Sequence, residues 1–174
     1  NQSRNYVFPL VIIGAFYFIF GFTTWANSQL IPYLKIACEL STSQSLLIPM
    51  AFFAAYFVMA LPASFILEKL GYKKGFIIGL CVMAAGALLF IPAGQSRSYS
   101  MFLVALFVIA TGLALLQTAS NPYVTVLGPL KSAAQRMSIM GICNKAAGFV
   151  AVLVMGGIVL KNVQDLIFII LKIY

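Results

Sequence analysis

Long stretches without a charged residue constrain this chain more than any other feature of its sequence. Four stretches contain no Lys, Arg, Asp or Glu, at residues 6–33, 44–67, 75–94 and 98–130, and a fifth, 137–160, contains only Lys145. A helix needs about 20 mostly apolar residues to cross the hydrocarbon layer of a membrane. We therefore predict an all-α membrane protein. Its five transmembrane helices are expected at about 6–33, 44–67, 75–94, 99–127 and 138–160, followed by an outer loop or the stub of a sixth helix at 161–174.

The composition excludes a water-soluble fold and most catalytic chemistry. Only 8% of the 174 residues are charged, whereas a soluble domain carries about 25% charged residues. The chain has no His and only three acidic residues, which removes His-based catalysis and leaves no His-ligated or carboxylate-rich metal site. The basic residues are dispersed between apolar runs, which argues against nucleic-acid binding. We therefore expect neither an enzyme nor a cofactor or metal, and a lipid bilayer as the surrounding medium.

The charges between the apolar runs predict an orientation in the membrane. Six basic residues fall on one side of the expected bilayer, and three fall on the other. The first group is Arg4, Lys69, Lys73, Lys74, Lys131 and Arg136, and the second is Lys35, Arg97 and Lys161. Because cytoplasmic loops carry an excess of Lys and Arg, we expect the N-terminus in the cytoplasm.

Polar side chains lie inside three of the expected spans, where each is costly unless it has a partner or faces a cavity. In the first span, Thr24 and Ser28 are four residues apart, with Asn27 between them, and in the fourth Gln117 and Asn121 have the same spacing. In the fifth span the polar residues Asn144 and Lys145 are adjacent. The candidate substrate-binding residues are Asn27, Ser28, Gln117, Asn121 and Asn144, and Lys145 is a candidate for coupling transport to an ion.

These residues have two interpretations. A single Asn or Gln in a span often bonds to a neighbouring helix for about 1 kcal/mol, and Lys145 can extend its ammonium towards the membrane boundary. The functional interpretation gains from the number of helices that carry carboxamides. Carboxamides both donate and accept hydrogen bonds. A ring of them suits an uncharged, polyhydroxylated solute better than an ion.

The connection between the second and third spans carries a charged motif. Its spacing resembles the cytoplasmic signature of the major facilitator superfamily, in which a small residue, an acid, bases and a glycine fall at fixed offsets. We interpret it as a gating loop in which Glu68 pairs with a base in one access state, and the alternative is a solvated loop that only sets topology. The matching residues are Ser64, Glu68, Lys69, Gly71, Lys73 and Lys74.

A more specific resemblance lies in the fourth span. The segment 116–129, LQTASNPYVTVLGP, is similar to the fucose:proton symporter family of that superfamily, and weaker similarity extends from about residue 8 to residue 160. The segment 140–145 resembles a branch that includes hexose and N-acetylglucosamine transporters. The resemblance implies twelve helices in two six-helix halves, a central sugar cavity and alternating access. It places cavity positions at Ser28, Gln117 and Asn144, with Asn27 and Asn121 beside them.

The chain departs from that family at two positions that matter for coupling. The family's symporter has an aspartate where this chain has Ser28 and a glutamate where it has Gln117. A carboxylate that gains and loses a proton is the usual basis of proton coupling, and neither Ser nor Gln can titrate in this way. The sequence therefore predicts a sugar site but leaves open a proton, a sodium ion or no coupling ion.

Together these features predict monosaccharide transport, of a hexose or hexosamine, across a bacterial cytoplasmic membrane. Five helices are fewer than a transporter of this superfamily needs, so we expect these residues to form most of an N-terminal half and to need a C-terminal half. We expect no transport from them alone. The alternative is a membrane assembly subunit that packs through its glycines and transports nothing.

Overall fold

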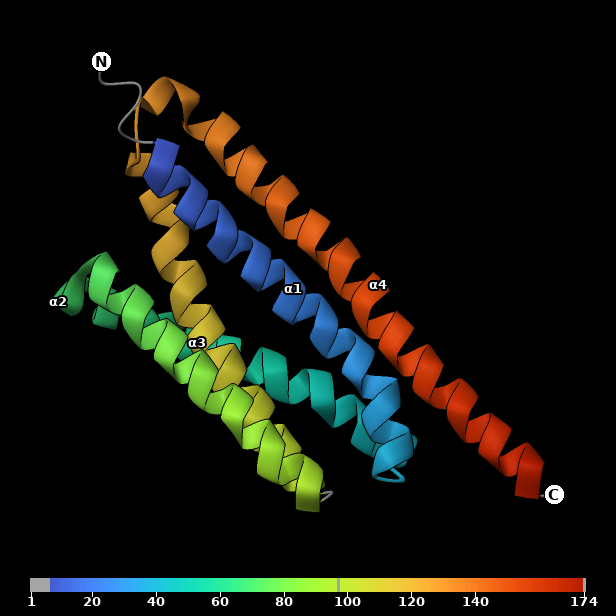
Figure 1. The fold of residues 1–174 in the computed structure, drawn as a ribbon. Coiled ribbons are helices and arrows are strands. Elements are labelled where there is room, and N and C mark those ends of the chain that lie inside the picture. The colour runs from blue at the N-terminus through green and yellow to red at the C-terminus, as the bar shows by residue number, and fades with distance from the viewer. Residues whose placement is uncertain (1–6, 97, 174) are drawn as a thin grey trace.

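The chain folds entirely into helices. The computed structural model describes residues 7–96 and 98–173, with side chains described up to 157 except at 33, 36 and 37. Four long helices follow one another, with a short 3-10 helix, η2, before the last (Figure 1). They are α1 (Val7–Ala37), α2 (Thr42–Ser96), α3 (Tyr99–Val126), η2 (Leu130–Ser132) and α4 (Ala133–Ile173). In the described part of the chain, all four long helices contain a segment long and apolar enough to cross a membrane.

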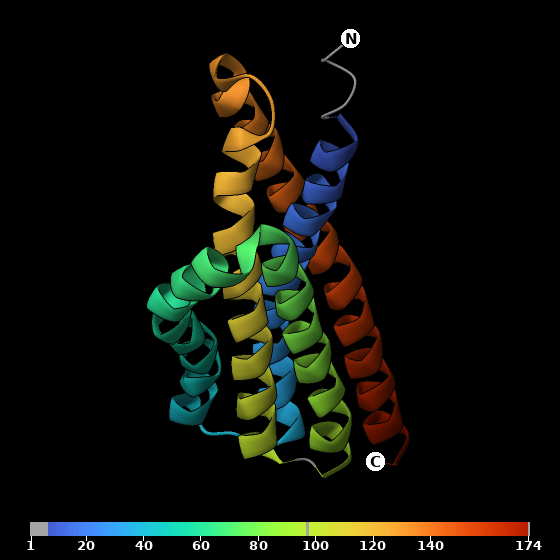
Figure 2. The ribbon, with the colours of Figure 1, turned by 90° about the vertical axis from the view of Figure 1, so that its left-hand side faces the viewer.

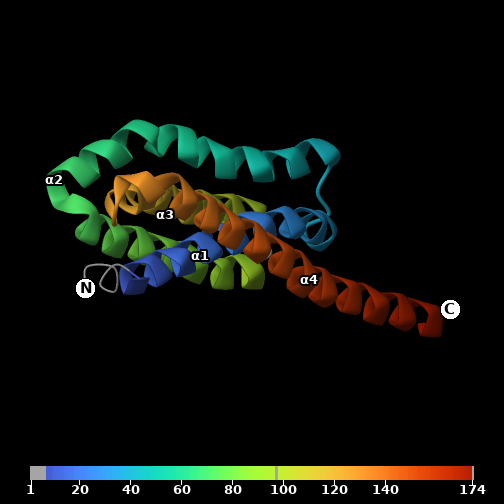
Figure 3. The ribbon, with the colours of Figure 1, turned by 90° about the horizontal axis from the view of Figure 1, so that it is seen from above.

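Helix α2 doubles back on itself at Gly71. Its 55 residues would extend about 80 Å if straight, but Gly71 has φ 76° and ψ 163°, a conformation almost restricted to glycine. Figure 3 shows the two resulting arms, 42–70 and 72–96, lying antiparallel. The separate helices expected at 44–67 and 75–94 thus correspond to these arms. The connection between them is one residue rather than the expected loop.

Helix α4 is longer than the sequence pattern suggested. It runs without a break over 41 residues, from Ala133 to Ile173, where a helix at 138–160 and then an outer loop or helix stub at 161–174 were expected. The reason is local, because the sequence between 158 and 173 contains neither Gly nor Pro to end the helix. Along most of its length α4 lies beside α1 (Figure 1).

Helix α3 occupies the centre of the structure. Half of its most apolar segment is buried, against about a fifth in the other three helices, and it lies between the arms of α2 (Figures 2 and 3). Its Leu113 and Leu116 pack with Phe20 of α1 and Phe52 of the first arm. On the second arm, a β-carbon at Gly79 would lie 2.6 Å from Leu116 Cγ. Such close backbone approach is how helices associate in lipid, where apolar burial gives no driving force.

Candidate functional site

A cavity of about 370 Å3 opens where four helical segments meet. It is referred to below as the four-helix cavity. Its lining combines hydroxyl, carboxamide, ammonium and aromatic groups, a mixture typical of sites that bind small polar ligands. The lining residues are Thr24, Trp25 and Ser28 of α1, Phe52, Phe53 and Tyr56 of the first α2 arm, Gln117 of α3, and Asn144 and Lys145 of α4.

The structure brings four of the six predicted site residues together in this cavity. Ser28, Gln117, Asn144 and Lys145 all line it, from three different helices. Thr24 joins Ser28 because residues four apart lie on the same helix face. With the phenol of Tyr56, the lining of the cavity therefore contains three hydroxyls, two carboxamides and one ammonium.

Asn27 lies elsewhere. Successive helical residues turn by about 100°, so Asn27 points away from Ser28 and lines a second, mostly apolar cavity of about 340 Å3 beside Phe90 and Leu106. Its side chain is only 7% exposed, and its Oδ1 has no hydrogen-bond partner among the described residues. The site prediction for Asn27 thus has no support from its position.

Asn121 also lies outside the four-helix cavity, one turn of α3 beyond Gln117. Its Oδ1 accepts a hydrogen bond from the Tyr17 hydroxyl of α1. Asn144 Nδ2 donates to the backbone oxygen of the same Tyr17 at 3.2 Å. Asn121 therefore joins α1 to α3, and Asn144 joins α1 to α4 while still facing the cavity.

The contact between α1 and α4 fixes how Asn144 and Lys145 are presented. Gly21 lies against the backbone of Asn144, and a β-carbon there would stand 2.0 Å from the Asn144 oxygen. One turn along each helix, Gly148 lies against the indole of Trp25. No side chain larger than hydrogen fits at either glycine without a shift, so the two helices and their cavity residues are held in register.

Among the described residues that line the four-helix cavity, Lys145 is the one that carries a charge. Its Nζ lies 5.9 Å from the centre of the Trp25 ring, within range of a cation–π interaction. Lys145 forms no ion pair with any residue whose side chain the structure describes. Glu39 lies in the turn before α2, Glu68 lies at the end of the first α2 arm, and Asp165 is 20 residues further along α4, about 30 Å by helical rise.

The aromatic residues of the cavity were missed by sequence reasoning. Trp25, Phe52, Phe53 and Tyr56 are four of 24 aromatic residues, and in a membrane sequence aromatic side chains facing lipid and facing a cavity look alike. Trp25 did carry a usable signal. It is the one Trp of the chain, and it precedes Ser28 by three residues, which places both on neighbouring parts of one helix face.

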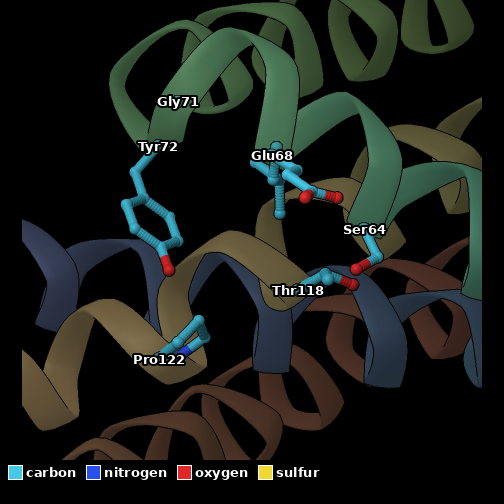
Figure 4. Close-up of a pocket in the computed structure, with 7 residues that line it drawn as sticks. Ser64, Glu68, Gly71, Tyr72, Thr118 and Pro122 are labelled. Carbon is cyan, nitrogen blue, oxygen red and sulfur yellow. The ribbon is translucent and has the colours of Figure 1, made fainter.

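Three residues of the predicted gating motif, Ser64, Glu68 and Gly71, line a different hollow at the break in α2. This pocket of about 520 Å3 is lined by Ser64, Leu67, Glu68, Gly71 and Tyr72 of α2 and by Thr118 and Pro122 of α3. Figure 4 shows Tyr72 reaching towards Pro122, with Glu68, Ser64 and Thr118 around the opening.

The bases of that motif do not face this pocket. Lys69, Lys73 and Lys74 are exposed, and Lys73 lines a separate apolar hollow beside Phe8 and Phe16 of α1. Glu68 has no ion pair with any residue that the structure describes. The latch between Glu68 and a base therefore stays a prediction, and it requires a partner brought in by another conformation or by further chain.

Arg136 has a structural role that the charge pattern did not reveal. Its side chain is 3% exposed, and its guanidinium donates to the backbone oxygens of Val124, Thr125 and Pro129 at 2.9–3.2 Å and to Ser132 Oγ at 2.6 Å. These acceptors lie at the end of α3 and in the turn before α4, where carbonyls lack helical partners and the helix dipole favours a cation. Arg136 thus fixes the turn between the two helices.

The comparisons with known proteins show which family has this fold. The profile of the Major Facilitator Superfamily matches residues 13–171, so the chain belongs to that superfamily and is a multi-pass membrane protein. Among its relatives are a glucose/galactose transporter of Brucella abortus, 44% identical over 87% of this chain, and the L-fucose-proton symporter of Escherichia coli, 40% identical over 94%. These relatives are transporters and not enzymes.

Solved structures show the same fold. The crystal structure of the E. coli fucose:proton symporter FucP superposes with a TM-score of 0.77 at 37% identity, over 91% of this chain. A structure of FucP in the outward conformation gives 0.78 at 38% identity. This chain spans 38% of the solved chains and 37% of the two relatives named above.

Proposed function

We propose that this chain is most of the N-terminal half of a monosaccharide transporter that works by alternating access, with the four-helix cavity as its share of the sugar site. One observation carries the proposal: Ser28, Gln117, Asn144 and Lys145, which lie up to 117 residues apart in the sequence, line one cavity together with Thr24. Its volume of about 370 Å3 lies in the range of small-molecule sites, about 300–1,000 Å3.

The chemistry of the lining favours a sugar. Hydroxyl and carboxamide groups both donate and accept hydrogen bonds, as the hydroxyls of a sugar do, and aromatic rings cover its apolar surfaces. The relatives named for glucose, galactose and fucose transport support a hexose or 6-deoxyhexose as substrate. A hexosamine is the second class to test, because an acetamido group would find partners in the same carboxamides.

The proposed transporter has twelve helices in the membrane, five of which come from this chain. Helix α2 supplies two of them, one for each arm. The excess of basic residues supports a cytoplasmic location for the start of α1, the α2 break and the α3–α4 turn. A bacterial cytoplasmic membrane is the location that the relatives support.

Proton coupling is part of the proposal. Among the residues that line the four-helix cavity, Lys145 is the candidate for the group that binds the proton. If Lys145 is not that group, it lies elsewhere in the transporter. A relative named as a proton symporter supports a proton as the driving ion. Neither Ser28 nor Gln117 titrates, so a proton requirement that persists in Lys145→Met would place the coupling group in the other half of the transporter.

The test is sugar uptake by the full-length protein in cells, with Gln117→Ala and Asn144→Ala as variants. Each substitution removes a hydrogen bond to the sugar, which is worth about 0.5–1.5 kcal/mol or roughly a two- to tenfold rise in KM. Gln135→Ala is the matched control, because Gln135 is exposed at the start of α4 and lines no cavity described above. Membrane abundance must stay constant, since Asn144 also bonds to Tyr17. Uptake kinetics unchanged in both variants would remove this cavity from the sugar site.

A further inference from the structure

Trp25 occupies an unusual place for a membrane tryptophan. Such residues gather at the membrane–water boundary, but Trp25 lies seven residues, about 10 Å, inside the end of the apolar span Val7–Pro32 of α1. Its side chain remains 41% exposed and lines the four-helix cavity. A large aromatic surface is therefore available to a ligand at this depth.

The position of the indole is set from α4. A β-carbon at Gly148 would stand 2.5 Å from Trp25 Cδ1 and 2.6 Å from Nε1, so the five-membered ring rests against a backbone that has no side chain. Three residues earlier on α4, Lys145 places its ammonium 5.9 Å from the centre of the ring. Gly148 thus contacts one edge of the ring, and the Lys145 ammonium lies over its face.

We infer that Trp25 is the stacking surface for the sugar and that Gly148 is its positioning residue. The inference rests on the proposed function and extends it to the substrate class, a pyranose whose C–H groups line one face of the ring. Those weakly positive C–H groups meet the negative face of the indole. A stacked sugar ring occupies the space over the indole, so the Lys145 ammonium moves aside and becomes a hydrogen-bond donor to a sugar oxygen.

The experiment compares KM and maximal uptake rate of the full-length protein for glucose, galactose and fucose. Trp25→Ala should raise KM about three- to tenfold, the worth of one aromatic contact, and Trp25→Phe should restore much of the loss. Gly148→Ala should raise KM in the same direction, because the new methyl group displaces the indole. Gly141→Ala on the same helix is the matched control, since a β-carbon there meets nothing within 4 Å, and it should leave KM unchanged.

The double variant Trp25→Ala/Gly148→Ala separates positioning from general packing. With no indole to displace, the second substitution should add nothing to KM. An equal effect of Gly148→Ala in both backgrounds, or a wild-type KM in Trp25→Ala, overturns the inference. If Trp25→Ala does not reach the membrane, the comparison of Trp25→Phe with Trp25→Leu replaces it, and equal KM values in those two variants overturn it.

These experiments distinguish a failure of the proposed function from a failure of the stacking inference. If the wild type takes up none of the three sugars and no hexosamine, the proposed function fails and the stacking inference fails with it. If uptake depends on Gln117 and Asn144 but not on Trp25, the sugar site stands and only the stacking surface is wrong.

Discussion

At the scale of single residues, two glycines of α1 that face α4 offer a matched comparison. A β-carbon at Gly21 would stand 2.0 Å from the backbone oxygen of Asn144, whereas one at Gly14 would make an ordinary contact of 3.8 Å with Met140 Cε. Gly21→Ala should therefore push α1 and α4 apart, break the bond from Asn144 to Tyr17 and destabilise the fold by about 1–3 kcal/mol. Gly14→Ala should be tolerated.

The measurements for this pair are membrane abundance and the Tm of the detergent-purified full-length protein. We expect a lower Tm and weaker sugar uptake for Gly21→Ala alone. Equal Tm values for the two variants would show that the α1–α4 contact is looser than the structure indicates.

How far the sequence predicted the site depends on the kind of residue. Ser28, Gln117, Asn144 and Lys145, which line the four-helix cavity, could be singled out as candidates because a polar group inside a membrane helix is costly unless it has a partner or faces a cavity. The same reasoning could not separate them from Asn27, which faces another cavity. Asn27 and Ser28 are adjacent polar residues, and the sequence alone does not show which of the two faces the four-helix cavity. Phe52 and Tyr56 could not be found at all, since only the packing of α2 on α3 turns them inward.

At the scale of helices, the break in α2 depends on one residue. Gly71 has φ 76° and ψ 163°, and any residue with a β-carbon is strained there by about 1–3 kcal/mol. Gly71→Ala should lower the Tm and the membrane abundance of the full-length protein, although a β-carbon at this position meets no other atom within 4 Å. Gly94→Ala is the control, because Gly94 lies in the second arm with equally open space and no positive φ. Equal Tm values for the two variants would contradict a conformational role.

The helices themselves followed from the sequence more fully than their ends did. Apolar runs of about 20 residues predicted the long helices, because bilayer thickness sets a minimum length for a helix that crosses it. The length of a run sets no maximum, however, and α4 continues to Ile173 because nothing in its sequence stops it. The single-residue turn at Gly71 could not be predicted either. The charged residues around it suggest a loop, yet Glu68, Lys69 and Lys73 are all helical.

At the scale of the whole molecule, the doubling back of α2 decides which ends of the helices face the same side of the membrane. Glu39 lies before the first arm, Lys73 at the start of the second arm and Gln95 near its end. If each arm crosses the bilayer once, Glu39 and Gln95 lie on one side and Lys73 on the other. From the positive-inside rule we expect the side of Lys73 to be the cytoplasm.

This arrangement can be tested by labelling with a membrane-impermeant maleimide in intact cells. Cysteines placed at 39 and 95 in a cysteine-free full-length protein should react, whereas a cysteine at 73 should react only after permeabilisation. The native cysteines of this chain to be replaced are Cys38, Cys81 and Cys143. Labelling of 39 and 95 from opposite sides would mean that α2 crosses the membrane only once. Labelling of 73 alone in intact cells would keep both crossings but invert the molecule, which would move the Glu68 pocket and the α3–α4 turn held by Arg136 to the outside.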